Sequence, residues 1–183
     1  MKYLKLFESL ENIHEICKKY NIKNYTINSD GSIDVDGNVY LSYLNLTKLP
    51  IKFRNIDGNF YCNNNNLTSL EGSPNSVGNY FSCSYNNLTS LEGGPTHVGG
   101  VFYCRNNKIT SLEGFPSNIG YSFICYDNPI SKIWILFRDK SKVELFNDYD
   151  IIRGKDIVID RLNDFLITIG KKPVESVKGY NNI

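Results

Sequence analysis

Cysteine is the residue in this chain whose type and spacing most directly suggest chemistry. Four of the five cysteines stand 21 positions apart, at Cys62, Cys83, Cys104 and Cys125. Four thiolates gathered around one ion would form a zinc site, with each sulfur about 2.3 Å from the metal. A strict period instead predicts a straight column, whose ends lie roughly 14 Å apart at three strand spacings. We therefore expect buried, reduced thiols and no metal centre.

Carboxylates and histidines offer two further candidate sites. Glu71, Glu92 and Glu113 repeat in the same register, but one column supplies too few oxygen ligands to surround a calcium ion, so solvated glutamates are expected. His14 and His97 have no nucleophile or acid partner at motif spacing. The sequence thus predicts a protein that is not an enzyme and that uses no metal or other cofactor.

The elements that must position these residues belong to a repeat of fixed length. Phenylalanine, cysteine and asparagine recur every 21 residues in the order Phe81-x-Cys83-x-x-Asn86. A strict period of roughly 20 to 50 residues is typical of a solenoid, in which each repeat packs only on its neighbours. The first unit is degenerate, as terminal repeats commonly are. The five units span 35–55, 56–76, 77–97, 98–118 and 119–139.

Each unit is expected to contribute one short strand, around 80–82 in the third unit, to a parallel sheet with strands roughly 4.8 Å apart. Five positions per unit are expected to point inward and to form columns through the stack. Asn86 stands where the backbone leaves the strand, and its amide can satisfy backbone groups of this turn and of neighbouring turns. In the third unit the inward positions are Val77, Phe81, Cys83, Leu88 and Leu91.

Both ends of the repeat array carry sequences that would close it. Residues 4–20 have apolar side chains at helical spacing, with Cys17 on the apolar face, and Asp30-Gly31 separates two short alternating segments, as in a β-hairpin. Residues 1–34 are therefore predicted to form an N-terminal cap, ahead of repeats over 35–130.

The C-terminal segment, residues 131–183, is predicted to be a helical cap. An apolar run at helical spacing follows Ser131, a capping box occupies 141–144, and the clearest helix covers 155–169 and is stopped by Gly170. The tail from Pro173 onward is expected to be loose.

The repeat resembles the leucine-rich repeat, whose pattern is L-x-x-L-x-L-x-x-N-x-L. Phe81 and Cys83 stand where the family has leucines, and Leu88 and Leu91 follow the asparagine in the family's order. The short unit, with Leu91-Glu92-Gly93 and then Pro95, is similar to the short bacterial subclass, and the chain resembles leucine-rich repeat proteins of bacteria and phages. The resemblance implies an α+β fold: a solenoid with a parallel sheet on its concave face. Some relatives add a ubiquitin-ligase domain with a catalytic cysteine, but this chain has no cysteine after Cys125.

Composition and charge exclude several classes of partner. The formal net charge is +1, and residues 35–130 carry five basic against six acidic side chains, so no basic stripe for nucleic acid is predicted. No segment approaches the roughly 20 apolar residues that span a bilayer. Charges at Lys2, Lys5 and Glu8 interrupt the place of a signal peptide. We therefore expect no membrane partner and a cytoplasmic protein of a bacterium or an infected bacterial host, with a virus particle as the alternative location.

The residues that alternate with the inward ones are expected to face outward on the concave sheet. Tyrosine, asparagine and serine predominate there, as in antibody binding loops, where tyrosine supplies rigid contact area and small polar residues adapt their hydrogen bonds. The candidate binding residues are Tyr40, Tyr43, Tyr61, Asn63, Tyr80, Tyr85, Tyr103, Arg105, Tyr126 and Asp127.

Several functions are compatible with this face. The first hypothesis is a protein-binding module, for example a phage or bacterial factor that acts on a host or competitor protein. A structural or assembly component of a virus particle and a carbohydrate-binding module are the alternatives. Tyrosine also simply suits exposed strand faces, so composition alone leaves these interpretations open.

Overall fold

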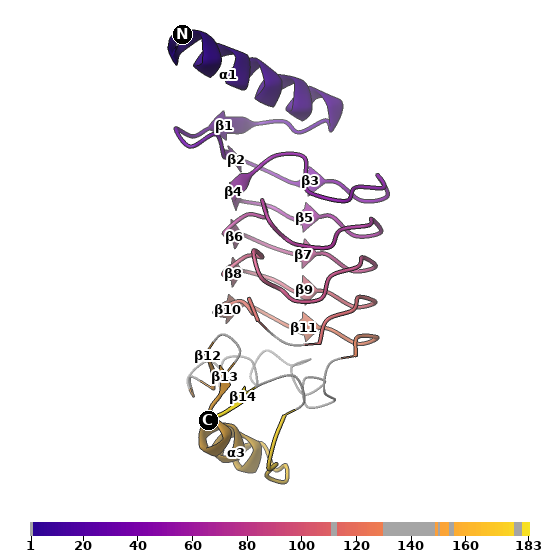
Figure 1. Ribbon diagram of the computed structural model, residues 1–183, viewed down its shortest axis with the longest axis vertical. Coiled ribbons are helices and arrows are strands. Elements are labelled where there is room, and N and C mark those ends of the chain that lie inside the picture. Colours follow the sequence, from indigo (N-terminus) through magenta and orange to yellow (C-terminus); the bar gives the residue numbers. More distant parts are fainter. Residues whose placement is uncertain (1, 111–112, 130–148, 150, 154–155, 178–180) are drawn as a thin grey trace.

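The protein is a β-solenoid, an elongated stack of coils built from short parallel strands (Figure 1). The computed structural model describes residues 2–110, 113–129, 149, 151–153, 156–177 and 181–183. Two sheets run along the stack, and successive coils pair in a register of 21 residues, for example Phe60 with Phe81 and Val77 with Val98. The predicted solenoid and its period are confirmed.

Each of the first four repeats contributes one strand to each of two sheets, and the described part of the fifth contributes β11 to the second sheet. The first sheet contains β1 (Tyr25–Ile27), β2 (Ile33–Val35), β4 (Phe53–Ile56), β6 (Ser76–Val77), β8 (His97–Val98) and β10 (Asn118–Ile119). The second sheet contains β3 (Val39–Tyr40), β5 (Phe60–Tyr61), β7 (Phe81–Ser82), β9 (Phe102–Tyr103) and β11 (Phe123–Ile124). Within these two sheets all pairings are parallel except that of β1 with β2.

The first sheet corrects the prediction of one strand per repeat. The strands of both sheets are two residues long from β5 onward. The second sheet has the alternating Phe-x-Cys pattern, whereas the first has a single recurring Val or Ile and so lacks the alternation that marks a strand in sequence. Val77 is fully buried in β6. Asn75 N–H and Gly78 N–H on either side of the strand donate to Arg54 and Ile56 carbonyls of the preceding coil. The backbone pairing there is therefore real, although the sequence shows only one recurring apolar residue.

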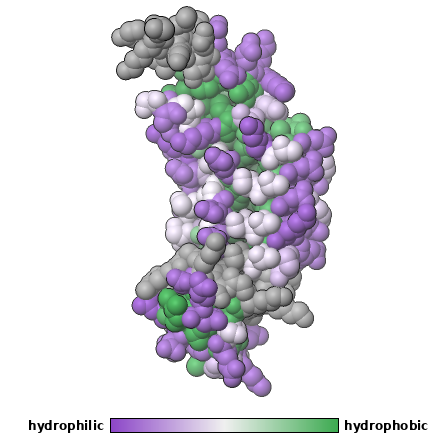
Figure 2. Space-filling model, viewed as in Figure 1, coloured by the Kyte–Doolittle hydropathy of each residue, from purple (hydrophilic) through white to green (hydrophobic). Residues whose placement is uncertain are grey.

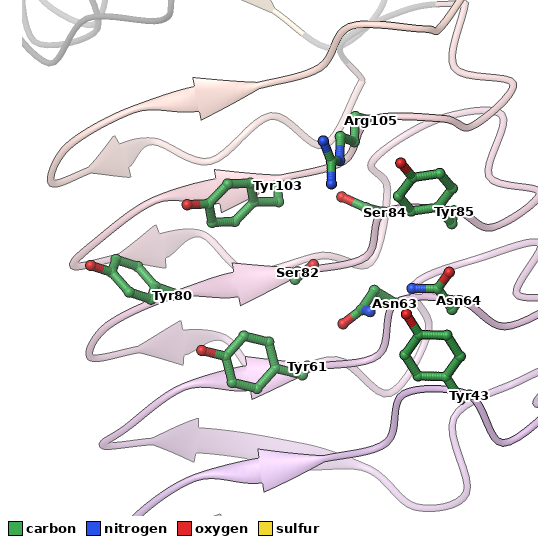
Figure 3. A pocket seen from close by; sticks show the side chains of 10 residues that line it. All are labelled: Tyr43, Tyr61, Asn63, Asn64, Tyr80, Ser82, Ser84, Tyr85, Tyr103 and Arg105. Carbon is green, nitrogen blue, oxygen red and sulfur yellow. The ribbon is translucent and has the colours of Figure 1, made fainter.

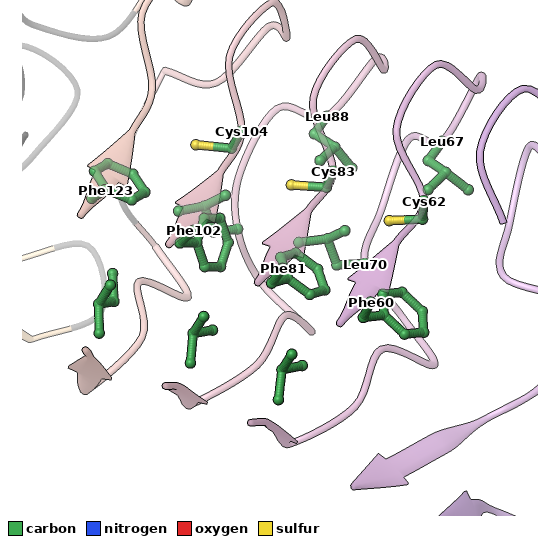
Figure 4. Close-up of a cluster of buried hydrophobic side chains, with 14 of the residues drawn as sticks. Phe60, Cys62, Leu67, Leu70, Phe81, Cys83, Leu88, Phe102, Cys104 and Phe123 are labelled. Atoms are coloured by element: carbon green, nitrogen blue, oxygen red, sulfur yellow. The ribbon is translucent and has the colours of Figure 1, made fainter. Parts of the chain in front are cut away.

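The core is a set of side-chain columns that run through the stack (Figure 4). Phe60, Phe81, Phe102 and Phe123 are each 0% exposed. Their neighbouring ring centroids lie 5.6, 4.9 and 5.6 Å apart, within the range in which aromatic pairs add about 0.5–1.5 kcal/mol beyond area burial. The cysteines and leucines of the repeat lie beside this column, as predicted.

A ladder of buried asparagines joins the coils. Asn86 Oδ1 accepts from Leu67 N–H at 2.9 Å, and its Nδ2 donates to the carbonyls of Cys62 at 3.1 Å and Cys83 at 3.0 Å. The amide thus satisfies backbone groups of its own coil and of the preceding one. The same arrangement recurs at Asn65, Asn107 and Asn128, which confirms the structural role predicted for these residues.

Glycine is required where consecutive coils approach most closely. A Cβ at Gly99 would stand 2.1 Å from the carbonyl oxygen of Gly78, and one at Gly120 would stand 1.9 Å from that of Gly99. These are the residues that directly follow the strands of the first sheet. The coils can therefore stack at the spacing of a parallel sheet only because no side chain intervenes there.

The N-terminal segment forms the predicted helix and hairpin. Helix α1 (Lys2–Lys19) lies across the N-terminal end of the stack (Figure 1), and hydrophobic residues gather next to it (Figure 2). Ile13, Cys17 and Ile22 are buried there. Strand β2 pairs with β1 on one side and with β4 on the other, so the predicted domain boundary at residue 34 falls inside a strand that also belongs to the first sheet.

The C-terminal segment differs from the prediction in two places. Helix α3 spans Ile159–Thr168, shorter than the predicted 155–169, because Asp156–Ile157 forms β13, which pairs with β12 (Ile152–Arg153). The tail is also not loose throughout, since β14 (Asn181–Asn182) pairs with β13. The helix predicted after Ser131 and the capping box at 141–144 lie outside the described residues.

Helix α3 ends at glycine as predicted. Gly170 has φ +70°, and its N–H donates to Ile167 O at 2.9 Å. Lys171 N–H then donates to Leu166 O at 2.7 Å. This pair of bonds is a Schellman motif, which satisfies carbonyls at the helix end and favours glycine at the left-handed position.

Candidate functional site

The exposed face of the second sheet contains a shallow hollow, which we call the tyrosine hollow. Strand alternation creates it, because Phe60 points into the core while Tyr61, the next residue, points out. The hollow has a volume of about 700 Å³ and spans four consecutive coils (Figure 3). Its lining residues are Tyr43, Tyr61, Asn63, Asn64, Tyr80, Ser82, Ser84, Tyr85, Tyr103 and Arg105.

Seven of the ten candidate residues line the tyrosine hollow, and three lie beside it. Tyr40 stacks on Tyr61, Tyr126 contacts Arg105, and Asp127 accepts from Asn106. Three lining residues were not among the candidates, namely Asn64, Ser82 and Ser84. The same alternation that predicts the candidates also places these three residues on the outward face of the sheet.

The tyrosines of the hollow are ordered by contacts with one another. The Tyr40 and Tyr61 rings stack with centroids 5.6 Å apart, and Tyr80 meets Tyr103 edge-on at 6.3 Å. Burial, with smaller contributions from the neighbouring phenols, raises the pKa of Tyr61 above its ordinary value. Tyr61 therefore keeps its proton at and above neutral pH and can donate a hydrogen bond.

Two tyrosines occupy backbone positions that tyrosine disfavours. Tyr43 has φ +61° and Tyr85 has φ +55°, in the left-handed region. The equivalent positions of other coils carry Asn64, Asn106 and Asp127, and Asn and Asp tolerate this conformation best after glycine. A bulky residue costs roughly 1–2 kcal/mol there. The backbone therefore does not explain the two tyrosines, and such strained positions are often found at binding sites.

Arg105 is held between two aromatic rings at one side of the hollow. Its guanidinium carbon lies 5.2 Å from the centroid of the Tyr85 ring and 5.4 Å from that of Tyr126. Its Nη1 also donates to the Tyr126 hydroxyl, and this hydrogen bond is the main cause of a raised Arg105 pKa. The side chain is half-buried. The cation is thus fixed in position and stays charged.

Ser84 adds a buried hydroxyl to the lining. The residue is 4% exposed, and its Oγ has no hydrogen-bond partner among the described residues. An unpaired buried polar group of this kind costs about 1–3 kcal/mol. Ser84 and Arg105 stand at equivalent positions of successive coils, and both line the hollow (Figure 3).

The residues with the most reactive side chains lie elsewhere. The repeat cysteines are buried free thiols, and burial raises the pKa of Cys62, Cys83 and Cys104 above the ordinary value, which disfavours the reactive thiolate. In the part of the chain that the structure describes, no three His, Cys, Asp or Glu side chains are grouped to hold a metal ion. His14 Nδ1 lies 2.5 Å from the Tyr25 hydroxyl, and His97 is exposed on β8.

The described helices give no membrane-spanning segment, since none is both long enough and apolar enough. No protein-family model, curated protein or solved structure matches the chain. Function must therefore be inferred from the residues of the tyrosine hollow themselves.

Proposed function

We propose that the protein is a non-enzymatic protein-binding module, in which the tyrosine hollow receives part of a partner protein. Five tyrosines from successive coils line this one hollow, together with small polar side chains. Tyrosine offers large contact area at low entropic cost, and it is enriched among the residues that dominate binding energy. This gathering of tyrosines is the observation that carries the proposal.

The strained tyrosines support the same function. Asparagine at positions 43 and 85 would suit the left-handed backbone better, as it does at Asn64 and Asn106. Keeping tyrosine at a conformational cost is expected where the side chain serves recognition, because sites of binding commonly retain residues that weaken the fold.

A leucine-rich repeat identity is part of the proposal. The 21-residue register, the parallel second sheet and the asparagine amide that serves two coils agree with this family's pattern. In this interpretation α1 with the β1–β2 hairpin caps one end of the solenoid, and α3 with its buried Leu162, Phe165 and Leu166 belongs to the cap at the other. Capping elements with a polar outer face keep solenoid ends soluble.

The biological setting is proposed from the resemblance alone. A bacterial or phage protein that occupies a host or competitor protein in the cytoplasm is the favoured setting. A role as a component of a virus particle is the alternative, and it would be supported by a stoichiometric amount of the protein in purified particles.

The test is capture, identification and reconstitution of the partner. The immobilised protein is incubated with an extract of the cell in which it occurs, the retained protein is identified by mass spectrometry, and the complex is rebuilt from purified components. Tyr61→Ala combined with Tyr103→Ala is expected to abolish the complex, because both rings line the hollow and supply much of its contact area.

Tyr121→Ala is the matched control. Tyr121 is 59% exposed and does not line the tyrosine hollow, so its loss should leave binding unchanged. Circular dichroism checks that each variant remains folded. A complex that survives the double substitution would contradict the proposal, and specific hits on a glycan array that depend on Tyr61 would favour the carbohydrate alternative.

A further inference from the structure

We propose that Arg105 anchors an acidic side chain, aspartate or glutamate, presented by a segment of the partner protein. This inference rests on the proposed protein-binding function and names the chemistry that the tyrosine hollow selects. Three observations support it: the positive charge of Arg105, the fixed orientation of its guanidinium, and the unpartnered hydroxyl of Ser84 in the lining of the same hollow.

Arg105 is the only charged residue among the ten that line the hollow. The ion pairs among the described residues are Lys52 with Asp30 and Arg54 with Asp34. No described carboxylate is in direct contact with Arg105, although the charge of Asp127 acts on it from further away and adds to its raised pKa. A half-buried cation without a direct ion-pair partner attracts a negative group more strongly than an exposed one, because water screens it less. The hollow therefore discriminates in favour of an anionic group.

The rings of Tyr85 and Tyr126 fix the orientation of the guanidinium. A guanidinium carries five N–H donors in one plane, and it binds carboxylates through two parallel hydrogen bonds. Nη1 donates to the Tyr126 hydroxyl, and further donors of the group remain for a ligand. Because the side chain is already held in place, a carboxylate that binds here does not have to order it.

Ser84 supplies a second donor at the same position. Its hydroxyl is buried without a partner among the described residues. Ser84 occupies the position equivalent to Arg105 in the preceding coil, and both residues line the hollow (Figure 3). An acceptor that enters from the hollow and displaces the covering atoms would give this hydroxyl the partner that it lacks in the free protein. A carboxylate has two acceptor oxygens and can accept from both Arg105 and Ser84.

The anion is a carboxylate of a protein and not a phosphate of a nucleic acid. Nucleic acids and phosphorylated motifs are bound by several cations acting together, whereas this hollow offers one. Its tyrosines and asparagines suit the apolar and amide groups of a peptide that flank an acidic side chain.

The experiment selects linear peptides from a random phage-displayed library on the immobilised full chain. Wild type is expected to select peptides with Asp or Glu at a fixed position, and Arg105→Gln to lose that preference while the other positions remain. Arg105→Glu should select Lys or Arg at the same position. Replacing the acidic residue of a selected peptide by its amide should weaken binding about tenfold, as expected for a charged hydrogen bond.

Ser84→Ala distinguishes the proposed contact from general attraction of charge. The variant should lose more affinity for the acidic peptide than for the amide peptide. The stability of the variant should not fall, since the substitution removes an unsatisfied hydroxyl. If peptides are selected that require Tyr61 and Tyr103 but show no acidic position, the acidic anchor is wrong and the binding function stands. If no peptide is selected, or if selected peptides bind without these tyrosines, both proposals fail.

Discussion

Asn86→Ala is expected to lower the free energy of unfolding by about 1.5–4.5 kcal/mol. Among the described residues, Leu67 N–H has no acceptor other than Asn86 Oδ1. Alanine therefore leaves a buried donor unpaired, at about 1–3 kcal/mol. The carbonyls of Cys62 and Cys83 each keep one hydrogen bond, from Asn65 and Asn107 respectively. Losing the two bonds that Asn86 donates to these carbonyls therefore adds only about 0.5–1.5 kcal/mol.

Equilibrium urea unfolding measures the total effect, and hydrogen exchange locates it. The Leu67 amide should exchange faster in the variant than the Leu88 amide, which donates to Asn107. The control is Asn87→Lys. Position 87 is equivalent to position 108 of the next coil, which carries lysine, and neither side chain forms a hydrogen bond among the described residues. It should change stability by less than about 0.5 kcal/mol. Equal effects of the two substitutions would refute the structural role of the ladder.

Three further perturbations test other parts of the structure. Gly99→Ala should destabilise by at least about 1–3 kcal/mol in urea unfolding, because its Cβ would stand 2.1 Å from Gly78 O. Tyr43→Asn should raise the free energy of unfolding by about 0.5–1 kcal/mol, because asparagine tolerates a left-handed backbone better, while the affinity for the partner falls. Arg54 holds the pKa of Asp34 below its ordinary value of 3.8. The ion pair of these two residues therefore stabilises the fold above about pH 4, and this contribution is lost as the pH falls through the lowered pKa. Asp34→Asn should remove that part of the acid dependence of stability, worth less than about 1 kcal/mol.

Each of these predictions has a distinct control. Asn79→Ala replaces an exposed side chain in the same coil as Gly78 and should leave the free energy of unfolding nearly unchanged. An equally small effect of Gly99→Ala would contradict the close approach of the coils. Tyr43→Ala removes the ring but keeps a residue that disfavours positive φ, and it should not stabilise as asparagine does. Arg54→Gln should flatten the acid dependence as Asp34→Asn does, and a steep remaining profile would show that the pair does not cause it.

The repeat was predictable because the same Phe, Cys and Asn positions recur in four of the five units, and the degenerate first unit keeps apolar residues at the two inward positions. Phe81, Cys83 and Leu88 fix the inward columns, and Asn86 marks the turn. The first sheet was not predictable as a sheet, because each of its strands contributes only one recurring apolar residue, Val or Ile, whereas each strand of the second sheet begins the alternating Phe-x-Cys pattern. The pairing of Asn181–Asn182 with β13 is likewise a contact between distant parts of the chain, with no local pattern.

The candidate site followed from strand alternation, which places Tyr61 and Tyr103 on one face. Its depth and its contacts did not follow, because they depend on rotamers and on the curvature of the stack. The strain at Tyr43 and Tyr85 did have a trace in the sequence, since Asn64, Asn106 and Asp127 stand at the equivalent positions and are the residues that tolerate positive φ. The unpaired hydroxyl of Ser84 had none.

The central claim is that the repeated residues build the solenoid and that the tyrosine hollow recognises a protein. The most direct test is the dissociation constant of the purified partner for wild type, for the Tyr61→Ala and Tyr103→Ala double variant, and for Tyr121→Ala, all with unchanged circular dichroism. We predict at least about 100-fold weaker binding for the double variant and no more than about a twofold change for Tyr121→Ala. Equal dissociation constants for all three proteins would contradict the claim and move the binding surface away from the hollow.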